Sequence, residues 1–132
     1  MEKIFSYNKE EKLKSRNEID QIFSSRNAFL IHPLKVFYLF SKLDSTTTIN
    51  CGVSVSKKHF VKAVDRNRIK RLLREAYRTN KIPLHDNITQ KKISIFVLYI
   101  DKKMPEHYIQ IESKMKLVIE KLNNLYHEEM AK

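Results

Sequence analysis

The sequence is poor in the residues that mark several large classes of protein. Its 132 residues include one glycine, three prolines and one cysteine. A single glycine excludes a glycine-rich phosphate loop and a collagen-like or linker-like composition. A single cysteine excludes an intramolecular disulfide, and the five histidines lack the spacing of a zinc site. The carboxylates form no cluster typical of a metal-dependent nuclease, and nothing in the sequence supports a nucleophilic triad.

Long apolar segments are also missing. No run approaches the roughly 18 residues that a membrane-spanning helix needs, and the N-terminal stretch MEKIFSYNKE lacks the apolar region of a signal peptide. We therefore expect a soluble, cytoplasmic protein with no membrane partner. The length predicts one compact domain over residues 1–132, with about 1–11 and 128–132 loosely ordered.

Positive charge is what the sequence has in excess. The formal net charge is +11, and it is unevenly distributed along the chain. Residues 53–81 hold ten basic and two acidic side chains, a net charge of +8. A basic segment of this density is typical of a surface that binds nucleic acid.

The apolar pattern predicts an α+β domain in which helices pack on a small sheet. The lone cysteine, Cys51, is expected to be a small buried side chain in a strand. The expected elements are a helix at 16–25 with a capping box at Ser15 and Glu18, an extended piece at 28–31, strands at 34–40 and 49–56, a helix at about 61–80, a loop at 79–92, a strand at 93–100, and a final helix with Pro105 in its first turn.

The helix at 61–80 has two contrasting faces. At about 100° per residue its apolar side chains share one arc, namely Ile69, Leu72, Leu73, Ala76 and Tyr77. The opposite arc is cationic, and Arg66, Lys70 and Arg74 form a like-charged i,i+4 ladder. Such a ladder is unfavourable unless an anion neutralises it, because like charges at this spacing repel. The pattern also allows an ion pair between Arg71 and Glu75.

The strand at 49–56 has one small, polar face. Asn50, Gly52, Ser54 and Ser56 alternate there with apolar residues. A face of this kind beside aromatic side chains admits a single nucleic-acid strand, whose bases can stack.

The sequence of residues 52–78, GVSVSKKHFVKAVDRNRIKRLLREAYR, closely resembles the signature of the bacterial ribonuclease P protein component. The resemblance extends over about residues 12–126. It implies the order αβββαβα, a small mixed sheet and a left-handed βαβ crossover around the basic helix. It also implies a protein subunit of a ribonucleoprotein endonuclease that removes the 5′ leader from precursor tRNA.

The same resemblance implies which component performs each task. Hydrolysis would be carried out by the catalytic RNA and its bound Mg²⁺, with no catalytic residue and no metal site on the protein. The protein would be monomeric, one per RNA, with the catalytic RNA and precursor tRNA as its partners. The residues implied to bind the catalytic RNA are Lys57, Lys58, Arg66, Asn67, Arg68, Lys70, Arg71, Arg74 and Arg78. The residues implied to line a leader-binding cleft are Ile19, Phe23, Phe37 or Tyr38, Ser54 and Ser56.

Alternatives remain open on the residues alone. A ribosomal protein, or another RNA-binding protein with no role in tRNA processing, would have a similar charge. A helix-turn-helix DNA reader is disfavoured, because a strand and not a helix is expected directly before the basic helix. A protein that cleaves RNA by itself is a further alternative. Phe23 could equally be an ordinary core residue.

Overall fold

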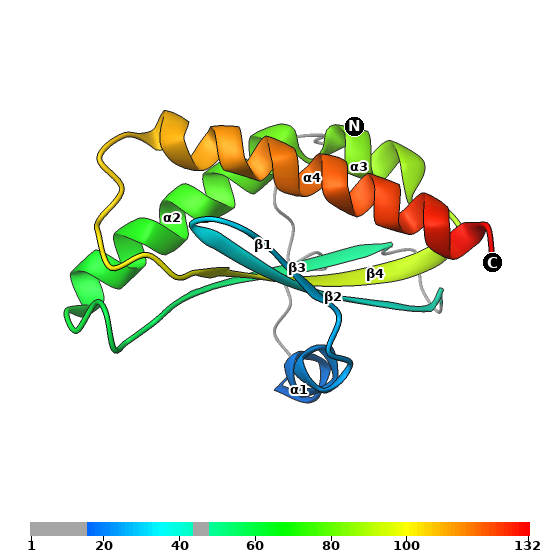
Figure 1. Ribbon diagram of the computed structural model, residues 1–132, viewed down its shortest axis with the longest axis horizontal. Coiled ribbons are helices and arrows are strands. Elements are labelled where there is room, and N and C mark those ends of the chain that lie inside the picture. The colour runs from blue at the N-terminus through cyan, green and yellow to red at the C-terminus, as the bar shows by residue number, and fades with distance from the viewer. Residues whose placement is uncertain (1–15, 44–47) are drawn as a thin grey trace, which may run out of the picture.

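The computed structural model describes residues 16–43 and 48–132, so Ser15 and its proposed capping box lie outside the described residues. Figure 1 shows a sheet with α1 on one face and α2, α3 and α4 on the other. The elements are α1 (Arg16–Ser24), β1 (Ala28–Ile31), β2 (Leu34–Lys42), β3 (Ile49–Val55), α2 (Ala63–Asn80), α3 (Ile82–Asn87), β4 (Lys91–Tyr99) and α4 (Tyr108–Met130). The predicted order αβββαβα is confirmed, with one short helix added after α2.

The sheet is mixed, as predicted. Its strand order is β1-β2-β4-β3. β4 pairs antiparallel with β2 and parallel with β3. Because parallel neighbours need a crossover, α2 and α3 connect β3 to β4 as a βαβ unit. The left hand of that crossover stays an expectation from the resemblance.

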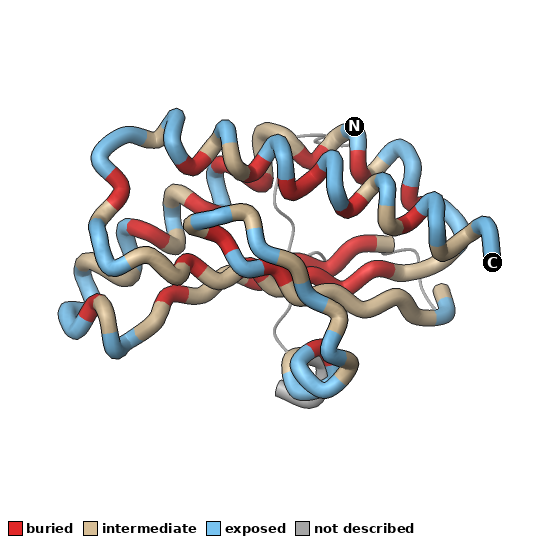
Figure 2. The backbone as a smooth tube through the Cα atoms, viewed as in Figure 1, coloured by how far each residue is buried: buried red, intermediate tan, exposed pale blue. Residues whose placement is uncertain are grey.

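Alternation along the strands separates the core from the α1 side. In β4 the buried side chains Ile93, Ile95, Val97 and Tyr99 belong to the core cluster shared with α2 and α4. The side chains between them, including Phe96, point to the α1 side, as the period of two requires. Figure 2 shows the buried residues concentrated between the sheet and the α2–α4 layer. Cys51 is buried in β3, as predicted.

α4 covers the sheet with the predicted helical periodicity. Its buried side chains are Ile111, Met115, Val118, Ile119, Leu122 and Tyr126. The predicted place of Pro105 in its first turn is wrong, because α4 begins at Tyr108. Hydrogen bonds hold the preceding segment as a loop: the Tyr99 hydroxyl donates to the Lys103 carbonyl at 2.7 Å, and the Lys103 N–H donates to Asp101 Oδ1 at 3.2 Å. The helix continues to Met130, inside the segment expected to be loosely ordered.

The segment 79–92, predicted as a loop, contains the short helix α3. Pro83 lies in its first turn, where the missing N–H of proline costs no helical hydrogen bond. Leu84 is fully buried, and its N–H donates to the Lys81 carbonyl at 3.0 Å. A helix of six residues carries too few apolar positions to show a period, so the sequence pattern does not indicate it.

Candidate RNA-binding surfaces

The exposed face of α2 is cationic, as predicted. Ile69, Leu73, Ala76 and Tyr77 are buried and fix the helix to the core. The exposed side chains on the opposite arc include Asn67, Arg68, Arg71 and Arg74, and Lys57 and Lys58 are exposed in the connection before the helix. We call these six residues the cationic face. Its arginines have the planar donor geometry that suits phosphate oxygens.

Arg66 differs from the rest of the predicted ladder. It is half-buried, and its Nη1 donates to the carbonyl oxygens of Phe60 at 2.9 Å and Val61 at 2.6 Å. The expectation that Arg66 belongs to a free outward ladder is therefore wrong, because the connection just before α2 offers it two carbonyl acceptors. Its guanidinium holds the segment that carries Lys57 and Lys58 against the helix.

Arg78 is also engaged within the protein. Its Nε donates to Glu75 Oε2 at 3.1 Å, and its Nη2 forms an ion pair with Glu75 Oε1. The hydrogen bond from Arg78 lowers the pKa of Glu75 below its usual value. The predicted Arg71–Glu75 pair is replaced by this i,i+3 pair. Lys70 is half-buried at the edge of the helix.

Three phenylalanine rings meet on the α1 side of the sheet. The Phe23 ring centroid lies 4.7 Å from that of Phe37 and 5.3 Å from that of Phe96, both edge to face. Phe23 is 41% exposed, and Phe37 and Phe96 are partly exposed. The rings are therefore anchored to the sheet while keeping surface free, as base stacking requires. Lys35 is exposed, and its Nζ lies 5.3 Å from the Phe37 ring centroid.

The polar face of β3 lies next to the phenylalanine rings on the α1 side of the sheet. Gly52 pairs with Phe96, and Ser54 pairs with Leu98, which also pairs with Lys35. Gly52 is buried, whereas Ser54 is partly exposed. The accessible part of this strand face is therefore its C-terminal end. We call Phe23, Phe37, Phe96, Lys35 and Ser54 the aromatic patch.

Three other residues predicted for the cleft, Tyr38, Ile19 and Ser56, are not part of the aromatic patch. Tyr38 points to the opposite face, where its ring lies 5.6 Å from that of Phe40. The choice between Phe37 and Tyr38 therefore falls on Phe37, because neighbours along a strand point to opposite sides. Ile19 is half-buried on α1. Ser56 follows the end of β3, and its hydroxyl accepts the Lys58 N–H at 3.2 Å.

Phe96 and Lys35 belong to the aromatic patch although they were not among the predicted cleft residues. Phe96 lies in a continuous apolar run, where periodicity does not indicate a second face. Only the register, which pairs Phe96 with Phe37, brings it beside Phe23. Alternation within 34–40 could have placed Lys35 on the same side as Phe37.

The described part of the chain has neither a metal-binding cluster nor a helix able to span a membrane. Residues 16–43 and 48–132 bring together no group of three or more His, Cys, Asp or Glu side chains able to hold a metal ion. None of the helices in these ranges is long and apolar enough to cross a membrane.

A cationic helix on one side of a small sheet and half-exposed aromatic rings on the other are features of a small, basic RNA-binding protein. Comparison with known proteins identifies which one. The chain belongs to the ribonuclease P protein family, since the family described as Ribonuclease P matches residues 7–123. It is accordingly a component of an endoribonuclease holoenzyme, has the ribonuclease P RNA as its partner and acts in tRNA 5′ processing. This decides against the ribosomal-protein alternative.

Individual relatives agree with this assignment. The ribonuclease P protein component of Porphyromonas gingivalis is 38% identical over 104 residues, which cover 77% of this chain and 76% of the relative. That of Legionella pneumophila strain Lens is 30% identical over 123 residues, covering 93% and 98%. The RNase P protein from Thermotoga maritima shares the fold with a TM-score of 0.64, at 23% identity over 84% of this chain and 96% of that one. The Staphylococcus aureus RNase P protein gives 0.61, at 24% identity over 83% and 93%.

Proposed function

We propose that this protein contributes binding to the ribonuclease P reaction and leaves the chemistry to the RNA. The cationic face binds the catalytic RNA, and the aromatic patch binds the 5′ leader of precursor tRNA. Mg²⁺ held by the RNA supplies the activated water and stabilises charge on the phosphate. One protein molecule acts with one RNA.

The observation that carries the proposal is the separation of the two surfaces by the sheet. α2 packs against β3 and α4, while α1 packs against β2 and β4 from the other side (Figure 1). One RNA can therefore cover α2 without covering Phe23 and Phe37. A subunit that binds a catalytic RNA and a substrate leader together needs two such surfaces.

The residues of the catalytic-RNA surface have different parts in this proposal. Arg68, Arg71 and Arg74 have exposed side chains, and they contact phosphates directly. Lys57, Lys58 and Asn67 extend the same surface. Arg66, Lys70 and Arg78 lie at its edge, and Arg66 and Arg78 act mainly through the contacts that they make inside the protein.

The leader is proposed to run across the aromatic patch. Single-stranded RNA exposes the faces of its bases, and each base stacked on an aromatic ring contributes about 1–3 kcal/mol. Phe23 has the most exposed ring of the three phenylalanines. Lys35 places a positive charge beside them for the backbone phosphate.

Purified protein incubated with precursor tRNA, with and without the catalytic RNA, tests the proposal. We expect no cleavage by the protein alone and stimulated cleavage by the RNA when Mg²⁺ is low. Cleavage at the 5′ junction by the protein alone would overturn the division of labour. Absence of stimulation would overturn the assigned binding role.

A further inference from the structure

Two valines at the start of α2 are exposed to an unusual degree. Val61 is 81% exposed and Val64 is 77% exposed. Within the residues that the structure describes, they are the two most exposed large apolar side chains, and Ile109 follows at 68%. A single apolar side chain on a surface needs no explanation, whereas neighbouring ones indicate contact with a partner.

The choice of residues in this segment does not favour the start of a helix. Lys62, between the valines, is the N-cap residue, and its side chain makes no capping hydrogen bond. Its positive charge also opposes the helix dipole, and serine or aspartate would stabilise this position better. Val64 lies in the first turn, where a mostly exposed β-branched side chain loses rotamer freedom without gaining burial. Residues that break local rules in this way are expected where binding sets the choice.

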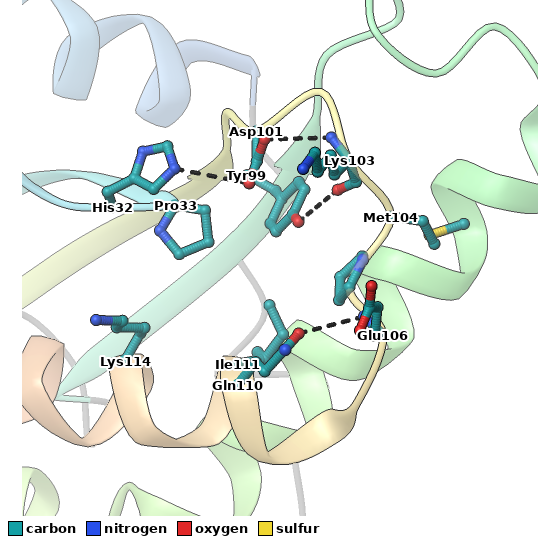
Figure 3. A pocket seen from close by; sticks show the side chains of 11 residues that line it. His32, Pro33, Tyr99, Asp101, Lys103, Met104, Glu106, Gln110, Ile111 and Lys114 are labelled. Carbon is teal, nitrogen blue, oxygen red and sulfur yellow. Dashed lines mark hydrogen bonds and ion pairs between the residues drawn. The ribbon is translucent and has the colours of Figure 1, made fainter.

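The backbone that carries Val61 is held in place from two sides. Arg66 Nη1 donates to the Val61 carbonyl at 2.6 Å and to the Phe60 carbonyl at 2.9 Å. The buried Phe60 ring lies 6.1 Å from the Tyr99 ring. Tyr99 lines the cavity seen in Figure 3, and its hydroxyl donates to the Lys103 carbonyl at 2.7 Å. An anchored segment therefore presents Val61, which reduces the entropy lost on binding.

The valines adjoin the cationic face. Residues three and four positions apart are neighbours on a helix, so Val64 lies beside Asn67 and Arg68, which both belong to that face. Lys62 is exposed between the valines, and Lys58 is exposed a few residues before them. The apolar surface is thus continuous with a surface proposed to bind RNA and is flanked by positive charge. A second copy of this chain would bring like charges together, so the charge favours RNA as the partner.

The apolar surface of an RNA lies chiefly on the faces of its unpaired bases. The backbone is charged, and in an A-form helix the bases are stacked and the deep groove is closed to side chains. Bases in loops and bulges are open to contact by side chains. Two valines beside arginines that bind phosphate therefore fit a nucleotide that lies outside a helix.

We propose that Val61 and Val64 contact the base of an unpaired nucleotide in the catalytic RNA, next to the phosphates bound by the cationic face. The proposal rests on catalytic-RNA binding by that face and adds a contact that does not depend on charge. Phosphates recur along the whole RNA and only position the protein, whereas a base contact selects a particular place. The valines thus direct the cationic face to one structured site.

The test measures catalytic-RNA binding by Val61→Ser/Val64→Ser over a range of salt concentrations. We expect binding roughly tenfold weaker than wild type, because burying one valine side chain already contributes about that factor. The slope of log affinity against log salt should equal that of wild type, since no phosphate contact is lost. Thermal unfolding should change little, because both side chains are exposed.

The matched control is Ile109→Ser/Leu117→Ser, which removes two exposed apolar side chains from α4 and should bind like wild type. Unchanged affinity in the valine variant, or an equal loss in the control, would overturn the inference. A slope lowered as much as in Arg68→Ala would also overturn it, because phosphate contacts would then explain the loss. If Arg68→Ala itself left catalytic-RNA binding unchanged, the cationic-face proposal would fail, and this result does not involve the valines.

A second measurement tests for the base. The catalytic RNA is probed with a base-specific modifying reagent at saturating concentrations of wild-type protein, the valine variant and the control variant. We expect an unpaired base that wild type and the control protect and that becomes reactive with the valine variant. Identical protection by all three proteins would contradict a base contact at these valines.

Discussion

Truncating Phe23 should reduce both stability and leader recognition, by amounts that the structure lets us separate. The residue is 41% exposed, so Phe23→Ala removes roughly 100 Å² of buried apolar surface. Losing this area should lower the free energy of unfolding by about 2.5 kcal/mol. A base stacked on the exposed part of the ring contributes about 1–3 kcal/mol, which is about a 5- to 150-fold change in affinity for precursor tRNA.

Phe23→Leu separates the two effects more cleanly. Leucine keeps much of the apolar contact with Phe37 and Phe96 but has no flat ring for a base. The ratio of precursor to mature tRNA affinity should therefore fall, while thermal unfolding changes little. The matched control is Phe40→Leu, because the Phe40 ring lies on the other face, 6.0 Å from that of Tyr126.

The assay is equilibrium binding of both tRNAs to holoenzyme, with the melting temperature of each variant protein measured beside it. If Phe23→Leu weakened precursor and mature tRNA equally, the ring would be a core residue only. If Phe40→Leu lowered the ratio as much as Phe23→Leu, the effect would follow from stability. Either result would refute leader stacking on this ring.

Three further predictions concern other parts of the protein. Arg68→Ala should lower the slope of log affinity against log salt for the catalytic RNA by about 0.7–0.9. Arg78→Ala should change this slope less, because Glu75 already neutralises the Arg78 side chain. Equal changes in slope for the two variants would contradict this ranking. Leu84→Ala should cost about 2–5 kcal/mol in denaturant unfolding, since this fully buried side chain anchors α3, and a loss below 1 kcal/mol would mean that the helix is not packed as described. The pKa of the Asp101 carboxyl is lowered, chiefly because it accepts a hydrogen bond from the Lys103 N–H. Its stabilising effect is therefore present above the unfolded-state pKa and is lost as pH falls through the folded-state pKa. Asp101→Asn should reduce the loss of stability between about pH 5 and 2, and an unchanged acid transition would contradict this prediction.

The elements with strong patterns were predictable from the sequence. α2 combines buried Ile69 and Leu73 with exposed Arg68 and Arg71, as its 3.6-residue period indicates. β3 and β4 have apolar runs of strand length and begin and end within two residues of their predicted bounds. α3 was not predicted, because a helix of six residues is too short to show a period.

The candidate sites were less predictable, because they depend on contacts between distant segments. The hydrogen bonds of Arg66 to Phe60 and Val61 follow from how the chain enters α2, which charge counting does not reveal. Phe96 joins Phe23 only through the strand register and the position of α1. The cationic face was evident from the charge pattern, and the family resemblance already implied Phe23, Phe37 and Ser54, whereas Phe96 and Lys35 became part of the aromatic patch only through the fold.

The central claim is that opposite sides of the sheet bind different RNAs. Its most direct test compares Arg68→Ala/Arg71→Ala with Phe23→Leu/Phe37→Leu in binding to the catalytic RNA and, as assembled holoenzyme, to precursor tRNA. We predict that the arginine pair weakens catalytic-RNA binding and keeps leader discrimination, and that the phenylalanine pair does the reverse. If both variant pairs weakened both interactions to the same extent, the two surfaces would not be separate and the claim would be contradicted.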